Sequence, residues 1–508
     1  MPAGRSPRGE SERALISMAA VLGTFGTAIW LRSLSGQPLS LVILAVVLTL
    51  SLSRQPRSAH GSHVVISVAV VPAVALCAGS IGHLLLTDPD VGVALFIAVM
   101  SASMWLRQFG PLVARTASLL SLPVTSILVV PGAGLDTSPH TPWWQMAVAL
   151  VALLWVQAVR TVASRLHRLP ADQPRPPAAP RQPGRGPRGH TRLALQLAVS
   201  LTSAYVVGRV LFPGHWNWTL LTATIVCSGG PSRGEVVMKG AARLVGAAVG
   251  TVVASWLATL FPGHDGVAVV AIFVLLFLAA WWREIVYAVW AGSVTCVMAL
   301  LNTYLGTPNT ASLLGTRLEA IGVGALCAVV SCAVILPVAT SSIVRRHRGS
   351  SLQAMGEVLH CMVEDPPALS AALVVLDART ADARRAVRSL RVRRMLFGHG
   401  GSVAHDLVST IDALAACRRP LHELVAQAGG HRDASWDRAL RTTIRNVGRT
   451  RQRVAGTAFA DLEPVHDVRV ADLDQAIRRI TADRALDGSD GNDGAAERVS
   501  QSGQQAPQ

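Results

Sequence analysis

The strongest constraint on this chain is a long succession of apolar runs, each bounded by a short polar or basic segment. A helix needs about 20 mostly apolar residues to cross the roughly 30 Å hydrocarbon layer of a membrane, and many of the runs approach this length. Hydrophobic residues make up 51% of the sequence and charged residues only 15%, a composition too apolar for a soluble multidomain protein. The sequence therefore predicts an all-α polytopic membrane protein.

The runs fall into two groups separated by a segment rich in proline and arginine. The first group lies at residues 13–31, 39–52, 64–86, 91–106, 112–130 and 143–162. The second lies at residues 193–212, 216–227, 236–261, 267–282, 285–301 and 313–336. Each group predicts six membrane helices, although some of the shorter runs in the first group are also compatible with half-membrane elements.

Basic residues in the loops predict the orientation. Arg54 and Arg57 lie in one loop and Arg107 opens another, whereas the alternating loops at 87–90 and 131–142 contain no lysine or arginine. The positive-inside rule then places the N-terminus and the C-terminal region in the cytoplasm, and the protein in the plasma (inner) membrane.

These patterns divide the chain into six predicted segments. They are a cytoplasmic tail (1–12), a first membrane repeat (13–165), a Pro/Arg-rich linker (166–191), a second membrane repeat (192–337), a cytoplasmic helical domain (338–486) and a disordered tail (487–508).

The two groups of runs are predicted to be copies of one unit. Asp90 and the apolar residues after it recur at Asp265, and the Trp-Leu-Arg of residues 105–107 recurs as Trp-Trp-Arg at 281–283, at a nearly constant offset. Because each copy has an even number of spans, the copies should lie parallel, related by an axis along the membrane normal. A transport pathway at the interface of the two halves is the corresponding hypothesis.

The second copy also carries a characteristic order of polar and aromatic residues. This order is Arg192, Trp216, Lys239-Gly240, Arg243-Leu244-Val245-Gly246, Trp282-Arg283, Arg317 and Pro337. It resembles the fusaric acid resistance and aromatic acid exporter superfamily and, more distantly, the membrane domain of aluminium-activated malate transporters. The resemblance covers residues 192–337 well and residues 13–165 as a degenerate copy.

The resemblance implies six membrane helices in each unit, units that pair around a pathway, and an organic anion as cargo. A homodimer in contact with membrane lipids is compatible with it. The first copy departs from the family pattern, because His60-Gly61-Ser62-His63 stands where Lys239 and Arg243 stand in the second. Whether the first copy binds cargo is therefore left open.

Charged residues near or within the spans are the candidate transport residues, because a charge in lipid is costly and usually faces a cavity or a partner. Lys239, Arg243, Arg283 and Arg317 are candidates for binding an anion, and Glu319 is a candidate for proton coupling. A structural alternative has Arg243 and Arg283 anchoring helix ends at the headgroups. For Arg317 and Glu319, the structural alternatives are an internal salt bridge and a lipid-facing interface position.

Tryptophans and glycines in the spans have mainly structural interpretations. The tryptophans at predicted helix ends favour an aromatic belt over stacking on an aromatic cargo; they are Trp143, Trp144, Trp216, Trp218, Trp281 and Trp282. The glycines are predicted to let helices pack closely; they are Gly246, Gly250, Gly322 and Gly324.

Beyond Pro337 the apolar residues adopt helical spacing and predict a bundle of about five amphipathic helices. Its basic run, residues 384–394, is interpreted as a solvated helix face, with anionic lipid headgroups or RNA as alternatives. No nucleic acid is expected as a partner, since the arginines lie mainly in loops and in this region.

The chain has no phosphate-binding GxxxxGK[ST] motif and no strong metal motif, so an enzyme, a cofactor and a metal are not expected. The function predicted is secondary, proton-coupled efflux of organic or aromatic acids. Two alternatives stay open: an anion channel of the same architecture, and a non-transporting scaffold whose cytoplasmic bundle recruits a partner.

Overall fold

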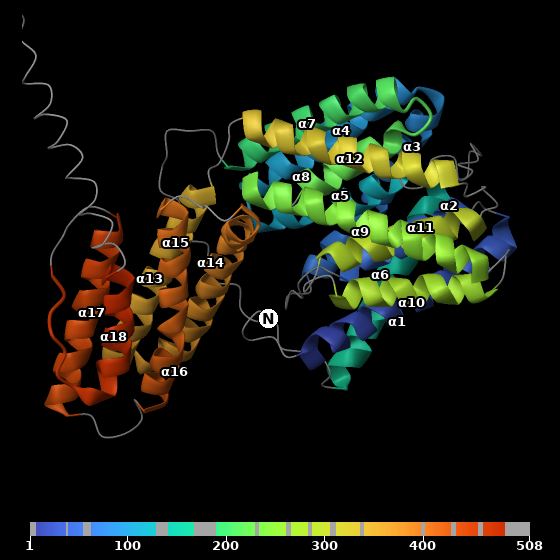
Figure 1. The fold of residues 1–508 in the computed structure, drawn as a ribbon. Helices are drawn as coiled ribbons and strands as arrows, with labels where there is room; N and C mark the ends of the chain where they lie inside the picture. The colour runs from blue at the N-terminus through green and yellow to red at the C-terminus, as the bar shows by residue number, and fades with distance from the viewer. Residues whose placement is uncertain are drawn as a thin grey trace, which may run out of the picture. The chain divides into compact units, whose positions relative to one another are not determined.

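Every regular element in the part of the chain that the structure describes is a helix. The computed structural model describes residues 7–36, 39–53, 62–128, 141–166, 189–228, 233–260, 266–282, 287–304, 311–335, 340–397, 402–427, 433–455 and 461–482. These residues form two compact units, one on each side of residues 336–339 (Figure 1). Most of the predicted linker and the predicted disordered tail lie outside the described residues.

The first unit contains helices α1 to α12. In its first half are α1 (Pro7–Ser35), α2 (Leu39–Ser53), α3 (Ser62–Thr87), α4 (Pro89–Leu106), α5 (Pro111–Ile127) and α6 (Thr141–Arg165). In its second half are α7 (Gly189–Leu211), α8 (Trp216–Cys227), α9 (Arg233–Leu260), α10 (Gly266–Trp282), α11 (Tyr287–Tyr304) and α12 (Ala311–Val334). Among the described residues, 7 helices are long and apolar enough to cross a membrane: α1, α3, α4, α6, α7, α9 and α12.

Local sequence explains where α4 and α5 begin. The Asp88 carboxylate accepts a hydrogen bond from the Val91 N–H at 3.3 Å, and Pro89 occupies the first turn, where its missing N–H costs nothing. Gly110 precedes α5 with φ 136°, a left-handed value that favours glycine, and Pro111 then starts the helix. These short signals separate α4 from the helix before it and α5 from α4.

Six helix pairs pack in the same way in both halves of the first unit. The contacts α1–α2, α1–α6, α2–α6, α3–α6, α3–α5 and α4–α5 recur as α7–α8, α7–α12, α8–α12, α9–α12, α9–α11 and α10–α11. Between the halves, α4 packs on α7 and its counterpart α10 packs on α1. Each half thus contacts the first helix of the other half through its fourth helix, as a pseudo-two-fold axis requires. This symmetry supports the internal repeat, which stays a prediction.

The two halves share a buried core. One cluster of buried apolar side chains draws on α3 and α4 of the first half and on α7, α8, α9 and α12 of the second. The Asn217 side-chain amide donates a hydrogen bond to the Leu128 carbonyl at 3.0 Å, and the Tyr205 hydroxyl donates to the Asp90 carboxylate. The halves are therefore joined by polar contacts as well as by apolar packing.

Large apolar side chains cover much of the outside of this unit. Val210 is 74% exposed, Val252 70% and Val334 72%, as expected for side chains that face lipid. Trp143 is 70% exposed, which agrees with its predicted place in an aromatic belt.

The second unit, called here the C-terminal domain, is a bundle of amphipathic helices. It contains α13 (Thr340–Glu364), α14 (Leu369–Phe397), α15 (Ser402–Ala416), α16 (Arg418–Gln427), α17 (Ala434–Ala455) and α18 (Val468–Ala482). A single cluster of buried apolar side chains from these helices forms its core, with Leu352, Val387, Ile411 and Ile477 at or near zero exposure.

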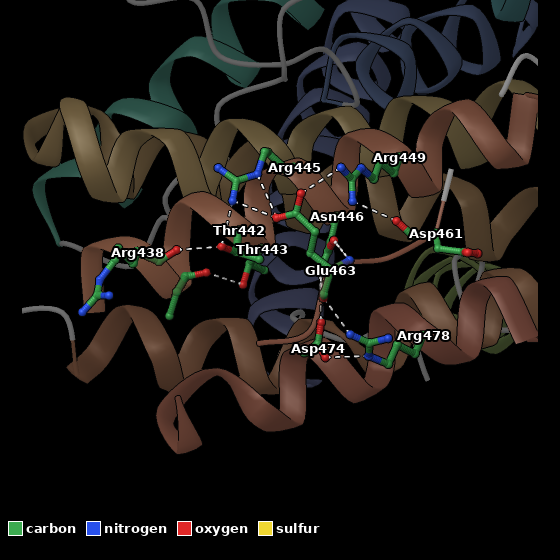
Figure 2. Close-up of polar contacts among 11 residues, drawn as sticks. Arg438, Thr442, Thr443, Arg445, Asn446, Arg449, Asp461, Glu463, Asp474 and Arg478 are labelled. Atoms are coloured by element: carbon green, nitrogen blue, oxygen red, sulfur yellow. Dashed lines mark hydrogen bonds and ion pairs between the residues drawn. The ribbon is translucent and has the colours of Figure 1, made fainter. Parts of the chain in front are cut away.

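A polar network fastens the segment between α17 and α18 to this bundle (Figure 2). The buried Asn446 side chain donates to the Glu463 carbonyl and accepts from the Glu463 N–H, both at 2.9 Å. Arg445 and Arg449 each bond the Glu463 carboxylate at 2.8 Å. Arg478 donates to the Glu463 carbonyl at 2.8 Å, so one residue receives contacts from both helices.

Candidate buried arginine site

Arg243 lies inside the membrane unit and not at its surface. It is ten residues into α9, about 15 Å from the start of the helix, and its exposed fraction is 1%. An arginine that anchors a helix end by snorkelling must extend its guanidinium to the headgroups, so this alternative is wrong for Arg243. Its burial instead requires a partner or a cavity.

Arg317 is buried beside Trp218. Its exposed fraction is 5%, and its guanidinium carbon lies 4.1 Å from the centroid of the Trp218 ring, a cation–π contact between α12 and α8. Trp218 is itself only 7% exposed. An aromatic belt requires contact with the headgroup region, so the predicted belt position is wrong for Trp218.

The two guanidinium groups have no compensating negative charge among the described residues. No ion pair involves either side chain, and the only charged group within electrostatic reach of Arg317 is Arg243. The Nε and Nη1 atoms of Arg243 and the Nε and Nη2 atoms of Arg317 are buried without a hydrogen-bond acceptor. Burying even one charge costs several kcal/mol when it is not compensated, so this pair is a candidate binding site for an anion.

Glycines allow close packing of the two helices that carry the arginines. A Cβ atom at Gly246 would overlap the Ala288 carbonyl oxygen, and one at Gly250 would overlap the Gly292 carbonyl oxygen, so α9 approaches α11 closely. A Cβ atom at Gly324 would overlap the Thr219 carbonyl oxygen, so α12 approaches α8 equally closely. The packing role predicted for these three glycines is confirmed.

Gly322 differs from the other three glycines. The nearest atom to a Cβ built there is the Leu244 Cδ1 at 3.9 Å, an ordinary van der Waals distance. Close packing is therefore not required at Gly322, since residues two apart on a helix point in different directions.

Glu319 and Arg317 are two residues apart on α12 and therefore also point in different directions. Glu319 is exposed whereas Arg317 is buried, and within the described ranges no contact joins them. The alternative of an internal Arg317–Glu319 salt bridge is therefore wrong. The role of Glu319 in proton coupling stays a prediction.

Two further predicted residues have different outcomes. Lys239 lies one turn before Arg243 on α9 and is half-buried, so it is on the same side of the helix as Arg243. Arg283 lies outside the described residues, and its predicted role stays untested.

Two buried hydroxyl groups near the arginine helices were not predicted from the sequence. Thr222 follows Trp218 by one turn on α8, and Thr295 precedes Cys296, which is within electrostatic reach of Arg317, on α11. Both hydroxyl oxygens are buried without a hydrogen-bond partner. Threonine is common in apolar runs, so only the packing distinguishes these two threonines from the others in the sequence.

The first half has no equivalent pair in its described helices. Helix α3 contains neither lysine nor arginine, and Arg160 of α6 donates to the carbonyls of Leu52 and Ser53 at 2.9 and 3.1 Å. The candidate site therefore lies within the second half and not between the halves. Within the described ranges, no group of three or more His, Cys, Asp or Glu side chains could hold a metal ion.

Together, the apolar helices and the buried arginines define a helical membrane protein with a cationic interior. Residues 203–331 match the family model for fusaric acid resistance protein-like sequences, and these residues include Trp218, Arg243 and Arg317. The match confirms, over residues 203–331, the resemblance stated from the sequence. No curated protein matches the chain. The family and the apolar helices together indicate a membrane transporter.

Proposed function

We propose that this protein moves organic anions across the membrane and that Arg243 and Arg317 bind the anion on its way. The observation that carries the proposal is the burial of both guanidinium groups without a carboxylate partner among the described residues. A bound carboxylate would supply the missing charge and accept the orphaned N–H groups in charge-assisted hydrogen bonds.

The direction and the energy source belong to the same proposal. Export of organic or aromatic acids is what the family resemblance implies, and a proton gradient is inferred because the sequence carries no phosphate-binding motif. Lys239 would guide the anion toward Arg243, and Arg283 would act elsewhere on the route. Glu319 is the candidate proton-coupling group.

The experiment uses the full chain in sealed proteoliposomes and measures uptake of radiolabelled benzoate, 4-hydroxybenzoate, malate and succinate. Uptake by the Arg243→Gln and Arg317→Gln variants should fall about 10- to 100-fold, because hydrogen bonds to charged groups contribute about 1.5–3 kcal/mol. Arg209→Gln is the matched control, since Arg209 lies in the same unit but is exposed.

Each alternative gives a different result. A channel would carry an anion current that reverses at the potential set by the anion gradient and ignores a pH gradient. Transport that needs a pH gradient but is unchanged in Glu319→Gln would remove that residue from the proposal. If correctly inserted protein moves none of the four anions, the scaffold alternative is the one to pursue.

A further inference from the structure

On α13 of the C-terminal domain, the exposed basic and acidic side chains lie at opposite ends. Arg345 and Arg346 are exposed in the first turns of α13, whereas the exposed acidic residues Glu357, Glu364 and Asp365 lie toward its end. A helix rises about 1.5 Å per residue, so the arginines are about 16–30 Å from these carboxylates. This exceeds the Debye length of about 10 Å at 0.1 M salt, so the carboxylates do not neutralise the basic end.

Helix α14 adds arginines to the same end. The chain turns back through η2 (Pro366–Ala368), so α14 runs antiparallel to α13 and packs against it. Burial lowers the pKa of His347 on α13, and the charges that act on it are those of Asp382, Arg379, Arg346 and Arg385. Asp382 pairs with Arg385. The start of α13 is therefore beside the arginine-rich half of α14.

Most of these arginines have no carboxylate partner. Within the described ranges, no ion pair involves Arg345, Arg346, Arg384 or Arg388, and all four are exposed. By contrast, six arginines of α16, α17 and α18 each bond a carboxylate. They are Arg418, Arg419, Arg445, Arg449, Arg469 and Arg478. Arg345, Arg346, Arg384 and Arg388 therefore form a group of uncompensated positive charges at this end of α13 and α14.

The basic end of α13 follows the last candidate membrane helix closely in the sequence. Only residues 335–339 separate Val334, the last residue of α12, from Thr340, the first residue of α13. Arg345 and Arg346 are therefore 11 and 12 residues beyond the end of α12. Basic residues that follow a membrane helix so closely are typical of segments that meet anionic lipid headgroups.

We propose that Arg345, Arg346, Arg384 and Arg388 form a surface that binds the anionic phospholipid headgroups of the adjoining leaflet. Guanidinium groups bond phosphate oxygens in a bidentate manner, and basic clusters next to a membrane helix are attracted to anionic lipid. The predicted orientation makes this the cytoplasmic leaflet. The surface would hold the C-terminal domain against the membrane whatever the first unit transports.

The test compares the full chain in nanodiscs of phosphatidylcholine alone and of phosphatidylcholine mixed with phosphatidylglycerol. Hydrogen exchange of the backbone amides at 343–349 and 382–390 is measured by mass spectrometry. Exchange should be several-fold slower in the mixed lipid at low salt, and the difference should disappear at 1 M salt, where charges are screened within about 3 Å.

Two triple variants separate this surface from general basicity. Arg345→Gln/Arg384→Gln/Arg388→Gln should abolish the lipid dependence. Arg438→Gln/Arg441→Gln/Arg451→Gln removes the same charge from exposed positions of α17 and should leave the lipid dependence intact. Amides in the core of α17 report whether each variant is folded.

Equal exchange in the two lipids, or an equal loss in both triple variants, would overturn the proposal. A short single-stranded RNA is added to the phosphatidylcholine nanodiscs in a further arm. Protection of these amides by RNA, without protection by phosphatidylglycerol, would assign the surface to nucleic acid and reject the lipid surface.

Discussion

Arg317 of α12 stacks on Trp218 of α8 with 4.1 Å between the guanidinium carbon and the ring centroid, and both side chains are buried. The contact fixes the plane of a guanidinium whose Nε and Nη2 atoms have no acceptor. Trp218 therefore orients the donor groups that an anion would use.

Replacing Trp218 should weaken anion binding. A desolvated cation–π contact contributes about 2 kcal/mol, so Trp218→Leu is expected to raise the Kd for a transported anion about 10- to 30-fold. Trp218→Phe keeps an aromatic face and should have a smaller effect. Equilibrium binding of a radiolabelled carboxylate to the purified full chain measures both changes.

Trp256→Leu is the control for Trp218, because Trp256 is 62% exposed on α9. If the Leu variants at both positions bind the anion equally well, Trp218 does not orient Arg317 for binding.

Gly324→Ala should separate α8 from α12. The new methyl group would overlap the Thr219 backbone, and backbone cannot move aside as a flexible side chain can. Overpacking of this kind costs about 1–3 kcal/mol. The thermal stability of the purified protein should fall, and so should its anion binding.

Gly322→Ala is the matched control on the same helix, because its methyl group meets only the Leu244 side chain at 3.9 Å. Its thermal stability should stay near that of the wild type. Equal destabilisation of the two variants would contradict the close approach of α8 and α12.

Asn446→Ala should release the segment before α18. The substitution removes both hydrogen bonds to the Glu463 backbone and leaves a partly buried N–H and carbonyl without this partner, a loss of about 2–4 kcal/mol. Faster hydrogen exchange at 461–467 and in α18 is the expected observation. Arg438→Ala removes an exposed side-chain bond from the same helix and should leave these rates nearly unchanged. Equal rates in wild type and Asn446→Ala would contradict the network.

Asp433 predicts a pH dependence of the C-terminal domain. Hydrogen bonds from the Trp436 N–H, the Ser435 hydroxyl and the Arg469 guanidinium lower its pKa from 3.8 to about 2. A lowered carboxyl pKa stabilises the folded state above the unfolded pKa, and this stabilisation is lost as the pH falls through the folded pKa. The stabilisation should therefore be complete above pH 4 and decline toward pH 2.

The measurement is the Tm of the C-terminal domain in wild type and Asp433→Ala across this range. The variant should have the lower Tm at neutral pH, and the two values should converge as the pH approaches 2. A constant Tm difference from pH 6 to pH 2 would show that the Asp433 carboxylate does not contribute through its charge.

The sequence predicted the helices of this protein well because their signals are local. Uninterrupted apolar runs define α1 to α12, and apolar residues at helical spacing define the C-terminal bundle. Neither signal depends on which other helices each helix packs against. Arg243 and Arg317 were also identifiable, because a charge within an apolar run is costly wherever that run packs.

Only the tertiary structure decided what these residues contact. Trp218 and Trp143 both stand at the ends of apolar runs, yet packing buries the first against Arg317 and exposes the second. Arg317 and Glu319 are neighbours in the sequence, but the turn of the helix sends one inward and the other outward. Arg243 and Arg317 are far apart in sequence, and only the close approach of α9 and α12 brings them within electrostatic reach. Apolar periodicity determines that a helix forms, whereas the shapes of the packed surfaces determine which helices meet.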